Sequence, residues 1–142
     1  MTKAEWQLVA DGLSGTWGIV ELEIDGFNIT LQRCLISKNR LGTMTYVNGE
    51  FKGKWITDKT VREGDFLRPT KKHIYSAKMR NDIKKLNKLL KKHPSERIKD
   101  LDPDMVYRSR SSFWGSVAAI RRHYEKTFTS IKLKKINGKN YD

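Results

Sequence analysis

The sequence predicts an α+β domain: a four-stranded antiparallel meander over residues 17–56, packed against helices at residues 76–92 and 112–126. A final strand is expected near residues 128–136. Three observations support this fold class. Two hairpin dipeptides join runs of β-favouring residues, apolar residues alternate along those runs, and apolar residues later recur at the 3.6-residue period of a helix.

The meander rests on its turns and on its alternation. Asp25-Gly26 and Asn48-Gly49 are strong hairpin signals, because a type I′ turn needs positive φ at both central residues. Before the first turn, Val20, Leu22 and Ile24 alternate with acidic residues, as in a strand with one buried face. The middle connection, residues 37–40, is a polar loop of ordinary hairpin length.

The first helix is predicted from an apolar stripe, with Ser76 as its N-cap. The stripe is formed by Met79, Ile83, Leu86 and Leu90. The second helix is predicted over residues 112–126, with Ser111 or Ser112 as its cap. Residues 128–136 alternate as a last strand pairing on an edge of the meander, and residues 137–142 are expected to fray.

Positive charge is concentrated in the second half of the chain. The 142 residues carry a net charge of +13 and are interpreted as a single domain, residues 1–142. Residues 1–67 form a neutral β half, with eight Lys and Arg against nine Asp and Glu. Residues 68–142 form a basic helical half, with twenty-one against seven. Such an asymmetry predicts a surface that attracts a polyanion.

The predicted binding residues follow this charge. Most lie on the first helix, where seven cations face a single acid, and like charges four residues apart repel unless a partner neutralises them. Arg108 and Arg110 are expected just before a helix N-terminus, which favours phosphate. The full set is Lys78, Arg80, Lys84, Lys85, Lys88, Lys91, Lys92, Arg108, Arg110, Arg121 and Arg122.

The motifs of common enzyme and metal sites are absent from the sequence. There is no Gly-rich phosphate loop, no G-x-S-x-G, no H-E-x-x-H and no C-x-x-C. Asp100, Asp102 and Asp104 lack the glycine and the glutamate of a calcium loop. We therefore predict no enzymatic activity, no cofactor and no metal. A lone Cys34, no signal peptide and no membrane-spanning run predict a cytoplasmic protein that does not act at a membrane.

Three segments resemble small uncharacterised proteins of bacteriophages and prophages: YVNGEFKGKWI at residues 46–56, RPTKKHIYSAK at residues 68–78, and the Lys/Leu helix that follows. The resemblance covers roughly residues 15–135. It implies an accessory phage protein acting in the cytoplasm of a bacterial host, where such proteins often interfere with restriction or CRISPR defences.

Two functions remain open at this point. The first is a non-enzymatic protein that binds DNA or RNA through its basic helical face, with little sequence specificity because phosphate contacts do not read bases. The second is an inhibitor that docks on an acidic surface or on a nucleoprotein complex of the host, of the anti-CRISPR or anti-restriction type. In that case Trp114 or Trp55 would be the anchor at the interface.

Overall fold

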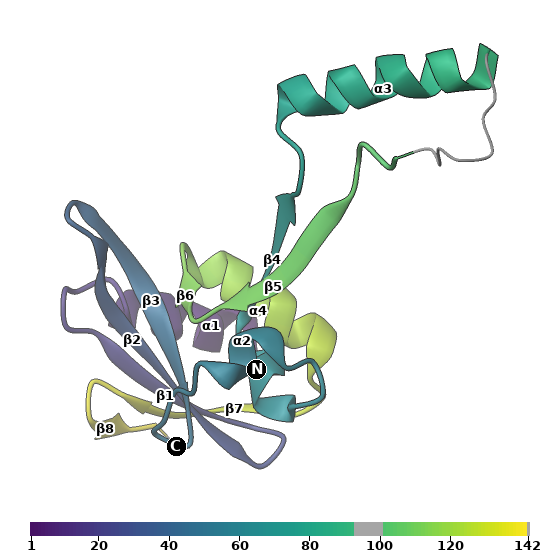
Figure 1. Ribbon diagram of the computed structural model, residues 1–142. Helices are drawn as coiled ribbons and strands as arrows, with labels where there is room; N and C mark the ends of the chain where they lie inside the picture. The colour runs from purple at the N-terminus through teal and green to yellow at the C-terminus, as the bar shows by residue number, and fades with distance from the viewer. Residues whose placement is uncertain (93–100, 142) are drawn as a thin grey trace. The chain divides into compact units, whose positions relative to one another are not determined.

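The computed structural model describes residues 1–92 and 101–141 of the chain, which forms two compact units. The sheet unit comprises residues 1–69 and 110–142, and the basic unit comprises residues 70–109. The α+β class predicted from the sequence is confirmed, with a six-stranded antiparallel sheet and a separate two-stranded sheet (Figure 1).

The strands of the six-stranded sheet follow the order β6-β3-β2-β1-β7-β8. Its centre is the predicted meander: β1 (Ile19–Ile24), β2 (Phe27–Ser37) and β3 (Arg40–Val47). The predicted last strand is β7 (Ile131–Ile136), which pairs with β1 on the edge of the meander as expected. The short strands β6 (Phe113–Trp114) and β8 (Lys139–Asn140) close the two sides of the sheet.

The predicted turns form as left-handed pairs. Asp25 and Gly26 have φ of 47° and 89°, and Asn48 and Gly49 have φ of 51° and 79°. A third pair, Asn137-Gly138, joins β7 to β8, so residues 137–140 form a hairpin rather than a frayed end. The Asn137 side chain anchors this turn, because its Oδ1 accepts a hydrogen bond of 2.9 Å from the Ile19 amide.

The predicted fourth strand of the meander is wrong. After the second turn only the isolated bridge between Val47 and Glu50 forms, and the chain continues as the helical turn α2 (Lys54–Thr57). The edge of β3 is paired instead by β6, through Thr43 with Trp114 and Met44 with Phe113. The helical turn carries Trp55 into the core, where its side chain is buried.

The second predicted helix begins later than expected. α4 spans Val117–Thr127, and its N-cap is Ser116, whose hydroxyl accepts a hydrogen bond of 3.2 Å from the Ala119 amide. Neither Ser111 nor Ser112 caps it. Phe113 has the helical spacing that would place it on one face with Val117, Ile120 and Tyr124, but it lies with Trp114 in β6, since pairing with β3 satisfies its backbone.

The core of the sheet unit lies on one face of the sheet. Alternate residues of the meander are buried there against α1 (Lys3–Gly12) and α4, which lie on the same side of the sheet in Figure 1. Two buried polar groups of this core have partners: Trp114 donates its indole N–H to Thr45 Oγ1 at 2.9 Å, and the Tyr124 hydroxyl donates to the Phe66 carbonyl at 2.8 Å. The indole N–H of Trp6 is buried with no partner among the described residues. Phe66 belongs to the short 3-10 helix η1 (Arg62–Phe66).

Two strands lead into and out of the basic unit. They are β4 (Arg68–His73) and β5 (Val106–Ser111), which form the two-stranded sheet. The predicted first helix is α3 (Ala77–Lys92), within one residue of the expected start. Unlike the meander, these strands contain no fully buried residue: six of their twelve residues are exposed and the other six are half-buried. The basic half that begins at residue 68 in the sequence is thus divided between the two units.

Candidate nucleic-acid interface

The basic unit holds a disproportionate share of the charge. Residues 70–109 carry twelve Lys and Arg against five Asp and Glu, which gives these 40 residues a net charge of +7. The other 102 residues carry seventeen against eleven, a net charge of +6. Charge density per residue is therefore about three times higher in the basic unit, which makes it the first candidate for a polyanion site.

Helix α3 begins where the sequence predicts a cap. The Ser76 hydroxyl accepts a hydrogen bond of 3.2 Å from the Met79 amide, which satisfies one of the amides that a helix start leaves open. One side of the helix is packed: Ile83 is buried, and Arg80, Asn87 and Leu90 are half-buried. Asn87 fixes this side, since its Nδ2 donates to the Leu101 carbonyl at 2.8 Å.

The lysines of α3 lie on the opposite side. At 3.6 residues per turn they fall within a continuous arc of about 140°, bounded by Lys91 and Lys78. All of them are exposed. This set, which we call the basic arc, consists of Lys78, Lys84, Lys85, Lys88, Lys91 and Lys92. The arc extends about 21 Å along the helix axis. The structure thus brings six of the seven cations predicted on this helix onto one exposed face.

Arg80 is the exception among the predicted contacts. It lies on the packed side of α3, half-buried, and its Nε is buried without a hydrogen-bond partner in the described part of the chain. Its position one turn before Ile83 explains this, because residues three and four apart share a helix face. Arg80 is therefore not part of the basic arc. Lys71, Lys72 and Arg108 on the two-stranded sheet are exposed and add cations to the same unit.

The apolar stripe predicted for α3 is only partly covered. Ile83 is 6% exposed, but Met79, Leu86 and Leu89 are 51%, 44% and 57% exposed. Met79 and Leu86 flank the packed side, whereas Leu89 lies near the border of the basic arc that Lys78 forms. The helix therefore presents both cations and apolar side chains to its surroundings.

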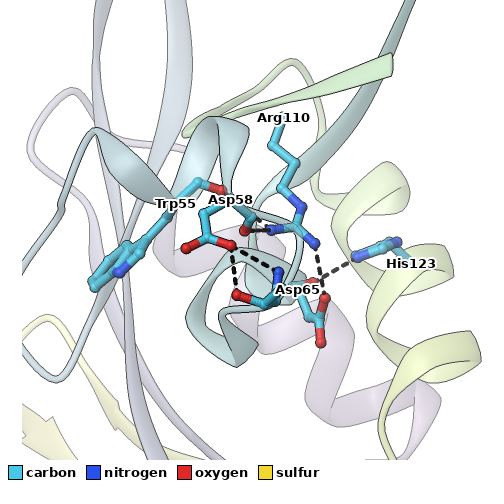
Figure 2. A network of polar contacts seen from close by, with 6 residues as sticks. Trp55, Asp58, Asp65, Arg110 and His123 are labelled. Atoms are coloured by element: carbon cyan, nitrogen blue, oxygen red, sulfur yellow. Dashed lines mark hydrogen bonds and ion pairs between the residues drawn. The ribbon is translucent and has the colours of Figure 1, made fainter.

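Arg110 has a structural role instead of the predicted phosphate contact (Figure 2). Its Nη1 donates to the carbonyls of Trp55 and Asp58 at 3.2 and 3.0 Å, and its Nη2 forms an ion pair of 3.2 Å with Asp65. The helix that was expected to place Arg110 near an N-terminus starts only at Val117. The guanidinium therefore joins α2, the loop after it and η1 within the sheet unit.

The neighbours of Arg110 are themselves fixed. The Asp58 carboxylate accepts hydrogen bonds from the hydroxyl and the amide of Thr60, at 2.6 and 2.9 Å, and these bonds hold the pKa of Asp58 below its ordinary value. His123 Nε2 lies 2.8 Å from the Asp65 carbonyl (Figure 2). Because a carbonyl oxygen can only accept, a hydrogen bond here needs the proton on Nε2. We call the contacts of Arg110 with Trp55, Asp58 and Asp65 the Arg110 clamp.

The remaining predicted cations lie on α4. Arg121 is half-buried and forms an ion pair of 3.0 Å with Glu125, one turn along the helix, and Arg122 is exposed. Of the four arginines predicted as contacts outside α3, Arg108 and Arg122 are exposed, and these two belong to different units. The tryptophans expected as interface anchors are core residues, since Trp114 is 1% and Trp55 4% exposed.

The open face of the sheet carries paired charges. Glu23 forms an ion pair of 2.8 Å with Lys134, and Glu21 one of 3.9 Å with Lys135. The hydrogen bond and the charge of Lys134 hold the pKa of Glu23 below its ordinary value. These carboxylates are therefore neutralised by neighbouring strands, which is the ordinary way to place charges opposite each other on a sheet.

Sequence reasoning missed two surface features of the sheet unit. Trp17 is 81% exposed and lines a shallow hollow of about 360 Å³ together with Ile19 and Asn137. Arg40 and Arg68 line a second hollow of about 340 Å³ beside the start of α4. No spacing in the sequence joins Arg40 and Arg68, because β3 and β4 bring them to one place only through the tertiary fold.

Among residues 1–92 and 101–141, no group of three or more His, Cys, Asp or Glu gathers in a way that would hold a metal ion. Asp102 closes a local turn there by accepting from the Asp104 amide at 2.9 Å, whereas Asp100 lies outside the described residues. In the described part of the chain, no helix is long and apolar enough to cross a membrane.

Comparisons with protein-family models, with curated proteins and with solved structures found no match to this chain. The resemblance to phage and prophage proteins therefore stays a prediction from the sequence.

Proposed function

We propose that this protein binds nucleic acid through the basic unit, without catalysing a reaction. The observation that supports this most strongly is the basic arc, six exposed lysines on one face of a 16-residue helix. Cations so close together repel one another, and the phosphates of a nucleic acid relieve that repulsion while releasing their own counterions. Lys71, Lys72 and Arg108 extend the proposed contact surface beyond the helix.

The resemblance to phage proteins suggests where the proposed binding would take place. An accessory protein in the cytoplasm of a bacterial host meets chromosomal and phage DNA at high concentration. A basic surface binds such polymers over many sites, since phosphate contacts are independent of sequence.

A charge-reversal experiment tests the proposal. Lys84, Lys85 and Lys88 are changed together to Glu, and the matched control changes the exposed Lys59, Lys126 and Lys139 of the sheet unit to Glu. Fluorescence anisotropy with a labelled duplex and a labelled single strand at about 50 mM salt measures binding. We expect the first variant to lose binding and the control to keep most of it. Equal losses, or no binding by the unmodified protein, would overturn the proposal.

A second function is favoured by one specific observation. The exposed apolar side chains Met79, Leu86 and Leu89 lie on the same helix as the basic arc, a combination suited to an acidic protein surface with apolar pockets. On this alternative the protein inhibits a nucleic-acid machine of the host, as anti-CRISPR or anti-restriction proteins do. Changing Leu86 and Leu89 to Ser distinguishes the nucleic-acid-binding function from the inhibitor function. Nucleic-acid binding is retained under the first proposal, whereas capture of a host protein is lost under the second.

A further inference from the structure

We propose that α3 enters the major groove of double-stranded DNA and that Asn81 contacts a base edge there. This inference rests on the proposed function and goes further, because it names the form of nucleic acid and the residue that reads it.

Asn81 lies almost at the centre of the basic arc. The arc spans about 140°, and Asn81 projects within about 10° of its midpoint. Its helical neighbours three residues before, three after, four after and seven after are all lysines: Lys78, Lys84, Lys85 and Lys88. Asn81 is exposed, and the single acid of the helix, Asp82, projects outside the arc. A neutral amide is thus surrounded by cations on the face that a polyanion would cover.

The second asparagine of the helix shows the contrast. Asn87 projects from the packed side, is half-buried, and donates its amide to the Leu101 carbonyl at 2.8 Å. Its role is therefore structural. The two asparagines have the same chemistry but project about 120° apart around the helix, and of the two only Asn81 presents its amide where a ligand of the lysines would lie.

The geometry favours a B-form duplex over other nucleic acids. A helix about 10–12 Å across fits a major groove about 12 Å wide, and lysines on both borders of the arc then reach the phosphates of both walls. The deep, narrow major groove of an RNA duplex does not admit a helix. Single strands are bound largely by stacking on aromatic residues, and α3 has none.

Asparagine is suited to the position that this geometry gives it. Its amide offers one donor group and one acceptor, which match the N7 acceptor and the N6 amino donor of adenine in the major groove. The surrounding lysines bind phosphate and carry no sequence information. We therefore expect a preference for adenine at one position of an otherwise loosely specified site.

Selection from duplexes with a randomised central segment tests the inference, using the full chain and the variants Asn81→Ala and Lys88→Ala. We expect the unmodified protein to enrich adenine at one position and to discriminate against other bases there by roughly 5–150-fold. Asn81→Ala should lose this discrimination but keep its salt-dependent affinity for unselected duplex. Lys88→Ala should weaken binding to all sequences and keep the preference.

Three results would overturn the inference: no enriched base, an unchanged preference in Asn81→Ala, or tighter binding to a single strand or an RNA duplex than to DNA. In each of these cases salt-dependent binding through the basic unit still supports the proposed function. Loss of all nucleic-acid binding by the unmodified protein would overturn both. Alanine favours helix more than asparagine does, so Asn81→Ala should fold, and a circular dichroism spectrum checks this.

Discussion

The Arg110 clamp should stabilise the sheet unit, and its contacts allow the loss of unfolding free energy in Arg110→Ala to be estimated. The Arg110 side chain is only 16% exposed, and its guanidinium makes two hydrogen bonds to carbonyls and an ion pair with Asp65. Hydrogen bonds from a charged donor contribute about 1.5–3 kcal/mol each, but the three contacts act together and are not additive. Asp65 is partly exposed, which lowers its share. We therefore expect Arg110→Ala to reduce the free energy of unfolding by about 2–4 kcal/mol.

Urea denaturation followed by tryptophan fluorescence measures this loss, and the matched control is Arg121→Ala. Arg121 makes an ion pair with Glu125 one turn away on the surface of α4, so its removal should cost only about 0.3–0.5 kcal/mol. On heating, Arg110→Ala should melt roughly 6–12 °C lower than the unmodified protein. If both variants lose the same small amount, the clamp does not stabilise the sheet unit and the reasoning is refuted.

Three further predictions concern the sheet unit. Gly64→Ala should destabilise the protein, because a Cβ there would clash with the Arg110 guanidinium and with the Trp55 carbonyl oxygen. Its effect should be smaller, but not lost, when it is combined with Arg110→Ala, which removes only the first clash; a double-mutant cycle checks this. Tyr124→Phe should cost about 1–3 kcal/mol in urea denaturation by leaving the buried Phe66 carbonyl unpaired. Burial raises the pKa of Tyr124 above its ordinary value of 10.0, so the folded protein loses stability from ionisation of this tyrosine only as the pH rises above 10. Tyr124→Phe should remove this loss of stability at alkaline pH, which unfolding measured across a pH series checks. Gly138→Ala should reduce the free energy of unfolding by roughly 1 kcal/mol, because φ there is +81° and a side chain strains this conformation. A slightly lower melting temperature checks this.

Local signals explain which parts of the fold the sequence could predict. The turns at residues 25–26 and 48–49 need only two residues with positive φ, and α3 needs only its cap and its apolar stripe. The fourth strand failed because its aromatic residues fit a strand and a helical turn equally well in sequence. Competition for the edge of β3 decided between them, and β6 lies more than sixty residues further along the chain. Local patterns carry no information about such distant pairing.

The candidate site shows the same limit. The lysines of the basic arc were predictable, because helical spacing alone places them on one face. The roles of Arg110 and Arg80 were not, since both depend on what packs around them: Arg110 contacts carbonyls of α2 and its following loop, and Arg80 borders the packed side of α3. Asn81 could have been singled out from sequence by its lysine neighbours, but only once the packed side of the helix was known.

The most direct test of the central claim is the dependence of duplex binding on salt. Affinity is measured by fluorescence anisotropy from about 50 to 200 mM salt for the unmodified protein, for the change of Lys84, Lys88 and Lys91 to Gln, and for the same change at Lys59, Lys126 and Lys139. If the basic arc contacts phosphates, the slope of log K against log salt becomes shallower by up to about 2.7 in the variant of Lys84, Lys88 and Lys91. The variant of Lys59, Lys126 and Lys139 keeps the full slope. Equal slopes in all three proteins would contradict the account.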